Sequence, residues 1–185
     1  MSSNLMPGTL LIADPFLKDP NFARTVVLLC EHQEEQGSFG FVINKLYDQS
    51  LSELVPDISL PNIPVYFGGP VQLDTIHFVH ELPHLIEGSM QLLPGIHWGG
   101  RFDQVVTLIN SGQADPRRIK FFIGYSGWST GQLQHELKEK SWILSEGNAR
   151  LIFREAEQDI WKVSLRSMGR DFAMMANFPI DPTLN

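Results

Sequence analysis

Three segments of the sequence contain residue types and spacings that could do chemistry. The first, His80-Glu81-Leu82-Pro83-His84, matches the pattern in which two histidines one helical turn apart bind zinc and the glutamate acts as a base. Pro83 argues against this use, because proline removes a backbone donor and biases Leu82 away from the helical region. We therefore predict a surface loop at the end of a strand here, and no metal site.

The second segment, Gly124-Tyr125-Ser126-Gly127-Trp128, is close to the turn that presents a nucleophilic serine in many hydrolases. That turn would need a glycine at position 128, where this chain has tryptophan. The only histidine after Ser126 is His135, and no aspartate lies between them. We predict a tight turn that packs two aromatic residues. A triad with the upstream histidines stays open, because a triad is defined by geometry and not by chain order.

The third segment, residues 95–101, is rich in glycine, ends at Arg101 and leads into an expected helix. Backbone N–H groups at a helix start, with a guanidinium beside them, can hold an anion. The segment lacks the glycine spacing and the lysine of nucleotide-binding loops. We predict an ordinary lead-in to a helix, with a small phosphate site as the alternative.

Length and charge limit the remaining possibilities. The chain has 185 residues with 43% hydrophobic residues, which suits one domain over 1–185 with a full hydrophobic core. Lys and Arg total 14 against 21 Asp and Glu, a net charge of −7. Because phosphate groups are neutralised by a basic surface, this balance argues against direct nucleic-acid binding and against anionic membranes.

The start of the chain and its cysteine content favour the cytoplasm. The first basic residue is Lys18, so no positive region of a secretory signal precedes it. No apolar stretch approaches the ~20 residues of a membrane span. Cys30 is the single cysteine and lies in an apolar run. We expect it to be a buried core residue and not a catalytic thiol.

The first half of the chain has the residue patterns of β-strands. Residues 25–31 and 39–44 flank a polar stretch with Gly37, which predicts a hairpin. A short capped helix is expected at 50–54, after Ser50. The other expected strands are residues 9–13, 65–67, 75–80 and 90–93.

The second half has helical patterns around one strand at 118–124. Phe102, Val105, Val106 and Ile109 form an apolar helical stripe that Gly112 ends. Further helices are expected after a capping box of Ser129 with Gln132, and along Trp161, Leu165 and Met168. Early hairpins with later helices indicate an α+β protein and not a doubly wound parallel sheet.

Five segments, taken in order, resemble the YqgE/AlgH family of bacterial proteins. They are GTLLIADP at 8–15, the stretch from Asp19 through FARTVVLLCEH at 22–32 to GFVINK at 40–45, GGPV at 68–71, GYSGW with GQL and Glu136 at 124–136, and DPTLN at 181–185. The resemblance implies an α+β fold in which a mostly antiparallel, bifurcated sheet closes into a pseudo-barrel with helices packed on it. It implies no established activity, although members are often labelled transcriptional regulators.

The polar and aromatic residues of these segments are the candidate ligand-binding residues. For each one, a structural role in a turn, a cap or the core is the alternative; Arg24 could hold an anion or pair with Asp19, and Asn44 could cap a strand. We assign no catalytic residue, no metal and no cofactor. The candidates are Arg24, Glu31, His32, Asn44, Gly68, Gly69, Tyr125, Ser126, Trp128 and Gln132.

The expected function is that of a cytoplasmic, non-catalytic regulatory or interaction protein whose partner is a protein or a small molecule. The alternatives are a small-molecule-binding protein, or a hydrolase with an unrecognised site around His32, Asn44 and Ser126. Direct DNA binding ranks last, because no helix-turn-helix is evident and the charge has the wrong sign. The sequence leaves the oligomeric state open.

Overall fold

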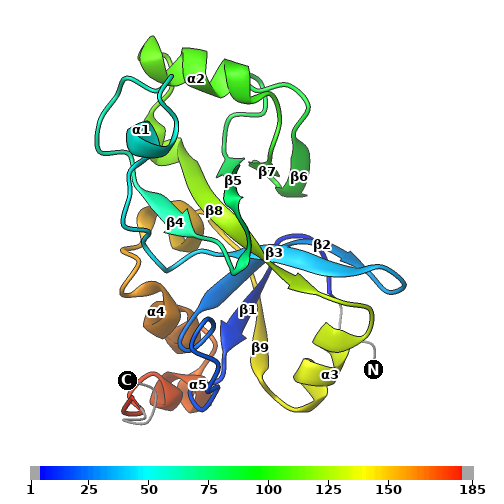
Figure 1. Cartoon of the computed structure of the whole chain (residues 1–185). Coiled ribbons are helices and arrows are strands. Elements are labelled where there is room, and N and C mark those ends of the chain that lie inside the picture. Colours follow the sequence, from blue (N-terminus) through cyan, green and yellow to red (C-terminus); the bar gives the residue numbers. More distant parts are fainter. Residues whose placement is uncertain (1–4, 181–185) are drawn as a thin grey trace.

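A computed structural model describes residues 5–180, so the family-like tail at 181–185 lies outside the described residues. The fold is α+β, with nine strands in one curled, mostly antiparallel sheet that forms a half-barrel with helices packed on it (Figure 1). The strands are β1 Thr9–Ala13, β2 Val26–Gln33, β3 Gly37–Val42, β4 Val65–Phe67, β5 Val71–His80, β6 Met90–Leu93, β7 Ile96–Trp98, β8 Ile119–Trp128 and β9 Trp142–Glu146. The helices are α1 Leu51–Leu54, α2 Phe102–Asn110, η1 Pro116–Arg118, α3 Gln132–Lys138, η2 Arg150–Arg154, α4 Ile160–Arg166 and α5 Arg170–Met175.

Strand β8 divides the sheet into two branches. The strand order is β6-β7-β5-β8-β3-β2-β1-β9, and β4 adds a parallel pairing to β8. The pairing of β8 with β5 ends at Tyr125, and its pairing with β3 begins at Ser126. Directly before this change of partner, Gly124 has a φ of 68°, a left-handed conformation that glycine adopts without steric cost. The expected bifurcated sheet is confirmed, and Gly124 lies at the point of division.

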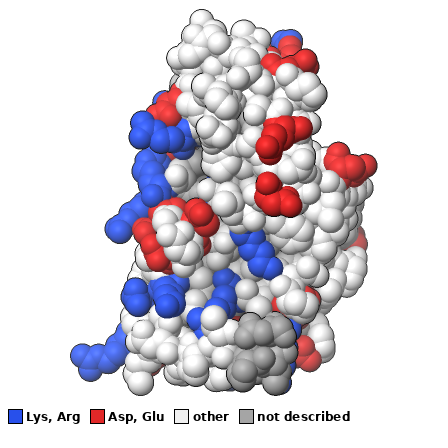
Figure 2. All heavy atoms as spheres, turned by 60° about the vertical axis from the view of Figure 1, so that its left-hand side comes forward, with Lys and Arg blue, Asp and Glu red and all other residues white. Residues whose placement is uncertain are grey.

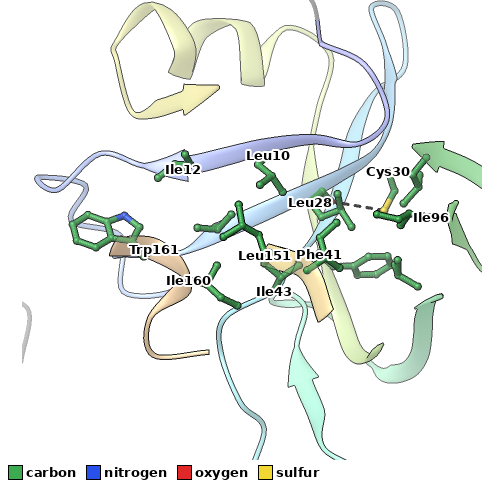
Figure 3. Close-up of a cluster of buried hydrophobic side chains, with 14 of the residues drawn as sticks. Leu10, Ile12, Leu28, Cys30, Phe41, Ile43, Ile96, Leu151, Ile160 and Trp161 are labelled. Atoms are coloured by element: carbon green, nitrogen blue, oxygen red, sulfur yellow. Dashed lines mark hydrogen bonds between the residues drawn. The ribbon is translucent and has the colours of Figure 1, made fainter. Parts of the chain in front are cut away.

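The central core lies between β1–β3 and the C-terminal helices. Leu10, Leu28 and Phe41 point from the sheet toward η2 and α4 (Figure 3). The indole Nε1 of Trp161 in α4 donates a hydrogen bond of 2.8 Å to the Ala13 carbonyl, which fixes the helix to the end of β1.

The free thiol of Cys30 belongs to this central core (Figure 3). Its burial, aided by the charge of Glu31, raises its pKa well above the ordinary value. The thiol therefore stays protonated, and the prediction of a buried core cysteine is confirmed.

The alternation of side chains along a strand lets the sheet bury both of its faces. On β2, Leu28 faces the central core, whereas Val27 and Leu29 face a second core with Leu133 of α3 and Trp142 of β9. A third core lies under α1 and α2. Its members include Leu51, Phe78, Val105, Ile109 and Phe121.

The structure corrects the local predictions in three places and adds elements that were not predicted. Residues 125–128 are not a tight turn, because β8 continues after its bend and pairs with β3. Strand β5 starts at Val71, earlier than expected. Residues 96–98 form strand β7 and not the lead-in to a helix. Strand β9, η2 and α5 had no sequence-based prediction.

Charges of both signs share the face drawn in Figure 2. Basic side chains follow one edge of this face, with acidic side chains among them. Arg117 contacts Asp115 at 3.0 Å and Arg154 contacts Glu81. The surface charges are therefore partly compensated and do not form a uniformly basic patch. Within residues 5–180, no helix has the length and apolar character that crossing a membrane requires.

Candidate functional site

The main candidate site is a cleft of about 590 Å³ at the place where the two branches of the sheet separate. We call it the aromatic cleft. Strands β2, β3, β5, β7 and β8 contribute to its walls, so it exists only because β8 changes partners. Its lining residues are Glu31, Gln33, Gln36, Gly37, Ser38, Phe39, Val71, His77, Trp98, Tyr125, Gly127, Trp128 and Ser129.

Phe39 of β3 is the centre of the aromatic wall. Its ring centroid lies 4.9 Å from that of Trp98 and 5.9 Å from that of Tyr125, both in edge-to-face geometry. Such pairs add about 0.5–1.5 kcal/mol to the burial of the rings. The mutual contacts therefore hold three flat side chains in fixed orientations in the wall of the cleft.

Gly127 provides a part of the cleft that has no side chain. It pairs with Phe39 across β3 and β8, and its φ is not in the left-handed region. A Cβ at this position would meet Tyr125 Cε2 at 3.5 Å, an ordinary van der Waals distance. The backbone thus does not require glycine, and its lack of a side chain leaves space inside the cleft.

The polar part of the cleft carries negative charge. Gln33 Nε2 donates a hydrogen bond of 2.8 Å to Glu31 Oε1, and Gln36 and Ser129 are further polar residues of the lining. The lining residues within the described chain include this one carboxylate and no lysine or arginine. The cleft therefore favours a neutral or positively charged ligand over an anion.

His77 is an apolar, neutral part of the wall at physiological pH. Its burial lowers its pKa below the ordinary value. Its ring packs 5.2 Å from the Phe41 ring and edge-on at 6.0 Å from Tyr125, while Nε2 lies 3.1 Å from Thr75 Oγ1. Because Thr75 Oγ1 also donates to the Gln72 carbonyl, the His77 ring is held in place from its own strand.

The structure brings three of the ten candidate residues together in the aromatic cleft, namely Glu31, Tyr125 and Trp128. Trp128 also belongs to the core under α3, where its indole Nε1 donates to Glu136 Oε1 at 3.4 Å. His32 lies next to the cleft. Its Nδ1 is 2.6 Å from the hydroxyl of Ser38, which lies opposite it on β3.

Ser126 is completely buried beneath the cleft. Its hydroxyl donates a hydrogen bond of 2.9 Å to the Gly68 carbonyl. Gly68 and Gly69 pass so close to β8 that a Cβ on Gly68 would lie 2.4 Å from the Gly124 oxygen. These two glycines permit a close approach of two backbones, and the hydrogen bond of Ser126 links the two backbones at this point.

Asn44 and Arg24 hold backbone together at the other end of the hairpin. The Asn44 amide accepts from the Val26 N–H at 2.9 Å and donates to the Arg24 carbonyl at 2.9 Å. The Arg24 guanidinium lies over the Trp161 ring, 4.6 Å from its centroid, and donates to the Phe178 carbonyl.

Gln132 is exposed and is the first residue of α3, and its side chain accepts from the Ser129 N–H at 2.9 Å in the loop before the helix. None of Arg24, Asn44 and Gln132 lines the aromatic cleft.

The other two motifs of the sequence, at 80–84 and 95–101, have structural roles in the described chain. His80 is fully buried at the end of β5, its Nδ1 accepts from the Leu82 N–H and its Nε2 lies 3.0 Å from the Gly99 oxygen. The described residues contain no cluster of three potential metal ligands.

Arg101, before α2, contacts Asp103 at 2.6 Å and Glu87 at 3.3 Å, so its charge is already compensated.

A family model described as AlgH-like matches residues 10–173. The chain belongs to the AlgH-like family. The resemblance seen in the sequence is thereby confirmed.

Full-length relatives support the same assignment. A UPF0301 protein from Chlorobium limicola is 42% identical over 181 residues, which covers 98% of this chain and 96% of the relative. One from Cytophaga hutchinsonii is 37% identical over 182 residues, covering 98% and 100%. These names state no reaction.

Two solved structures share the fold. The solution structure of the AlgH protein from Pseudomonas aeruginosa has a TM-score of 0.74 and 29% identity, and the match covers 97% of each chain. A crystal structure of a protein from Corynebacterium diphtheriae has a TM-score of 0.75 at 21% identity, covering 96% of this chain and 95% of the other, and shows the fold alone.

In this AlgH-like protein the segment 124–128 carries both the fold and the cleft. Gly124 makes the bend of β8, Ser126 fixes the buried side, and Tyr125 and Gly127 face the cleft. Sequence reasoning missed Phe39, His77 and Trp98. The alternation of side chains between the two faces of a strand could have placed Phe39 and Tyr125 on one face. No local pattern indicates that the Trp98 ring contacts Phe39 there.

Proposed function

We propose that this AlgH-like protein is a non-catalytic regulatory protein of the cytoplasm that binds a flat, neutral or cationic small molecule in the aromatic cleft. The observation that carries the proposal is the wall of Phe39, Trp98 and Tyr125 next to the position of Gly127, which has no side chain. The cleft volume of about 590 Å³ falls within the range of about 300–1,000 Å³ that is usual for small-ligand sites.

The charge of the site supports a cationic or neutral ligand. Glu31 is half-buried at the end of the cleft and has Gln33 as its hydrogen-bond partner. A cation placed between Glu31 and the face of an aromatic ring would gain from both, whereas a carboxylate or phosphate ligand would meet only repulsion at Glu31. The site therefore differs from nucleotide-binding and DNA-binding sites, which must accommodate phosphate groups.

The arrangement of nucleophiles supports binding over catalysis. The hydroxyl of Ser126, the serine of the hydrolase-like motif, is buried and bonded to the Gly68 carbonyl. Ser38 and His32 are within proton-transfer distance of each other, but a serine hydrolase also needs a third group that orients the histidine. Among the described residues, Ser38 is the one side chain that hydrogen-bonds to His32.

Titration with three probes that share one ring system tests the proposal. Tryptamine is cationic, indole-3-ethanol is neutral and indole-3-acetate is anionic at pH 7. We expect ¹H–¹⁵N NMR shifts at Phe39, Trp98 and Gly127, with affinity decreasing in that order and at least tenfold between the first and the last. Tightest binding of the anion, or shifts elsewhere in the chain, would overturn the ligand class.

A fluorophosphonate probe tests the non-catalytic part separately. We expect no covalent label on Ser38, with a known serine hydrolase in the same tube as a positive control. A label on Ser38 that disappears in Ser38→Ala would show a hydrolase instead. Fractionation of host cells tests the location, and recovery outside the cytoplasm would contradict that part of the proposal.

A further inference from the structure

A second cavity, at the opposite end of β8 from the aromatic cleft, contains a buried lysine. Its volume is about 390 Å³, and it lies between the segment at 60–66, η1 and the end of η2. Lys120 of β8 is 7% exposed and lines this cavity. We call it the lysine pocket. Its other lining residues are Leu60, Pro61, Asn62, Ile63, Pro64, Tyr66, Pro116, Arg117, Ile119, Phe153 and Glu155.

The contacts of Lys120 position its amine without neutralising a charge. Nζ donates a hydrogen bond of 2.9 Å to the Ile152 carbonyl and lies 4.1 Å from the centroid of the Tyr66 ring. No carboxylate of the described residues is within ion-pair distance of Nζ, and Glu157 acts on it only from farther away. A buried ammonium without a close counter-ion is unfavourable, so this environment favours the neutral amine.

The pKa of Lys120 follows from the same environment. Burial lowers this pKa to about 7, against a weaker opposing effect of the charge of Glu157. Near neutral pH, a large fraction of Lys120 therefore carries a free electron pair on Nζ. Desolvation in an apolar pocket is one of the ways in which proteins activate a lysine as a nucleophile.

Another partly buried lysine shows what a purely structural lysine looks like in this chain. Lys45 also has a pKa lowered by burial, but its Nζ donates to two carbonyls, those of Pro20 at 3.0 Å and Asn21 at 2.9 Å. It lines neither the aromatic cleft nor the lysine pocket. Lys120 differs in having a single carbonyl partner and a cavity beside it.

We propose that Lys120 is a nucleophilic lysine that forms an imine with a small aldehyde or ketone entering the lysine pocket. The electron pair of Nζ attacks the carbonyl carbon, a C–N bond forms, and the carbonyl oxygen takes up a proton to give a carbinolamine. Loss of the hydroxyl group with a proton from nitrogen, as one water molecule, leaves the C=N bond. The reaction needs no oxidant, reductant or cofactor.

The charged residues of the pocket select among carbonyl compounds. Arg117 lines the pocket and is bonded to Asp115 through Nε and Nη2, so its exposed guanidinium can still donate from Nη1 to a carboxylate on the incoming compound. Glu155, the acid of the same lining, is already in contact with Arg150 at 3.4 Å. A carbonyl compound that bears a carboxylate is therefore favoured over a neutral one of the same size.

Reductive trapping tests this inference on the full chain. The protein is incubated with glyoxylate, or with neutral glycolaldehyde, in the presence of cyanoborohydride, which reduces imines to stable amines. Peptide mass mapping then assigns the label. We expect Lys120 to be labelled at least tenfold faster than any of the other five lysines, with half-maximal rate near pH 7 and faster labelling by glyoxylate.

Variants and controls make the result decisive. Lys120→Met must lose the fast label, while Lys162→Met, at an exposed lysine on α4, must keep it. Labelling spread evenly over the exposed lysines of the wild type would overturn the inference, and this outcome does not depend on whether Lys120→Met folds. Gly127→Val should label normally, because the lysine pocket shares no lining residue with the aromatic cleft.

Discussion

Phe39 of β3 lies directly opposite Gly127 of β8, so an aromatic side chain faces a position without a side chain across the pairing of two strands. The Phe39 ring is fixed by its contacts with Trp98 and Tyr125. Gly127 leaves room beside that fixed ring. This pairing makes the surface of the sheet concave at the point where its branches separate.

Gly127→Val should close the aromatic cleft without unfolding the protein. Position 127 is in extended backbone, where valine is favourable, and its Cβ would make only ordinary contacts. We expect tryptamine binding to weaken at least tenfold, measured by NMR titration, and the free energy of unfolding to change by less than about 1 kcal/mol.

Ser145→Val is the matched control for Gly127→Val. It adds valine to β9, which is separated from β3 by β1 and β2 and does not line the cleft. Binding should be unchanged in this variant. Equal tryptamine affinity in Gly127→Val and the wild type would show that the aromatic cleft is not the binding site.

Gly124→Ala should destabilise the protein strongly, because it acts on the bend that divides the sheet. Gly124 has a φ of 68°, and a Cβ there would lie 2.4 Å from the Gly69 oxygen. The left-handed conformation costs about 1–2 kcal/mol for a non-glycine residue, and the steric clash adds about 1–3 kcal/mol. Chemical denaturation should show a loss of about 2–5 kcal/mol.

Gly112→Ala separates the two causes of this loss. Gly112 has a similar φ of 74°, but an added Cβ would have no atom within 4 Å. The loss of stability in Gly112→Ala should therefore stay near the cost of the left-handed conformation, about 1–2 kcal/mol. If both alanine variants lose the same stability, the close approach of Gly69 to β8 is not a constraint on the fold.

The parts of the fold that depend on neighbours in the chain could be predicted from the sequence. The hairpin of β2 and β3 follows from two apolar runs around Gly37, and α2 follows from the spacing of Phe102, Val105 and Ile109. The short capped helix after Ser50 was also predicted, and in the structure the Glu53 side chain accepts from the Ser50 N–H at 2.7 Å. Each signal lies within a few residues of the element that it specifies.

The features that depend on distant partners could not be predicted in this way. A glycine-rich segment such as 124–128 is compatible with a turn or with a bent strand, and only its pairing with β3 decides between them. Likewise, the sequence predicted a strand at 118–124, but it did not indicate that the charged side chain of Lys120 is buried beside a cavity. Its burial is set by Ile152 and Tyr66, which belong to other elements.

His77 should make stability depend on pH below neutrality. Burial lowers its folded pKa, so between the unfolded value near 6.5 and that lower value the unfolded chain binds more protons than the native chain. The corresponding stability is fully present above the unfolded pKa and is lost as the pH falls through the folded pKa. His77→Phe keeps an aromatic ring against Phe41 and removes the titration.

Denaturation of both proteins between pH 8 and pH 5 measures this effect. The wild type should lose stability relative to His77→Phe as the pH decreases. Burial also lowers the pKa of His80. The difference in stability between the wild type and His77→Phe removes that shared effect and isolates the contribution of His77. His84→Gln, at an exposed position, should follow the wild type, and parallel curves for all proteins would contradict a burial effect at His77.

Lys120→Met should remove a pH dependence on the alkaline side, because a folded pKa of about 7 lies well below the ordinary lysine value. Between these two values the unfolded chain binds more protons than the native chain, so the stability of the wild type rises with pH. This contribution of Lys120 to the stability is fully present above the unfolded pKa and is lost as the pH falls through the folded pKa of about 7. Methionine has a similar shape and no titrating group.

The difference in unfolding free energy between the wild type and Lys120→Met should therefore move by about 2 kcal/mol in favour of the wild type from pH 7 to pH 9, since each pH unit contributes up to about 1.4 kcal/mol. The range stops at pH 9 because burial raises the pKa of the neighbouring Tyr66, which titrates above it. Lys162→Met, at an exposed position, should show no such change. A constant difference across this range would mean that Lys120 stays charged in the folded protein.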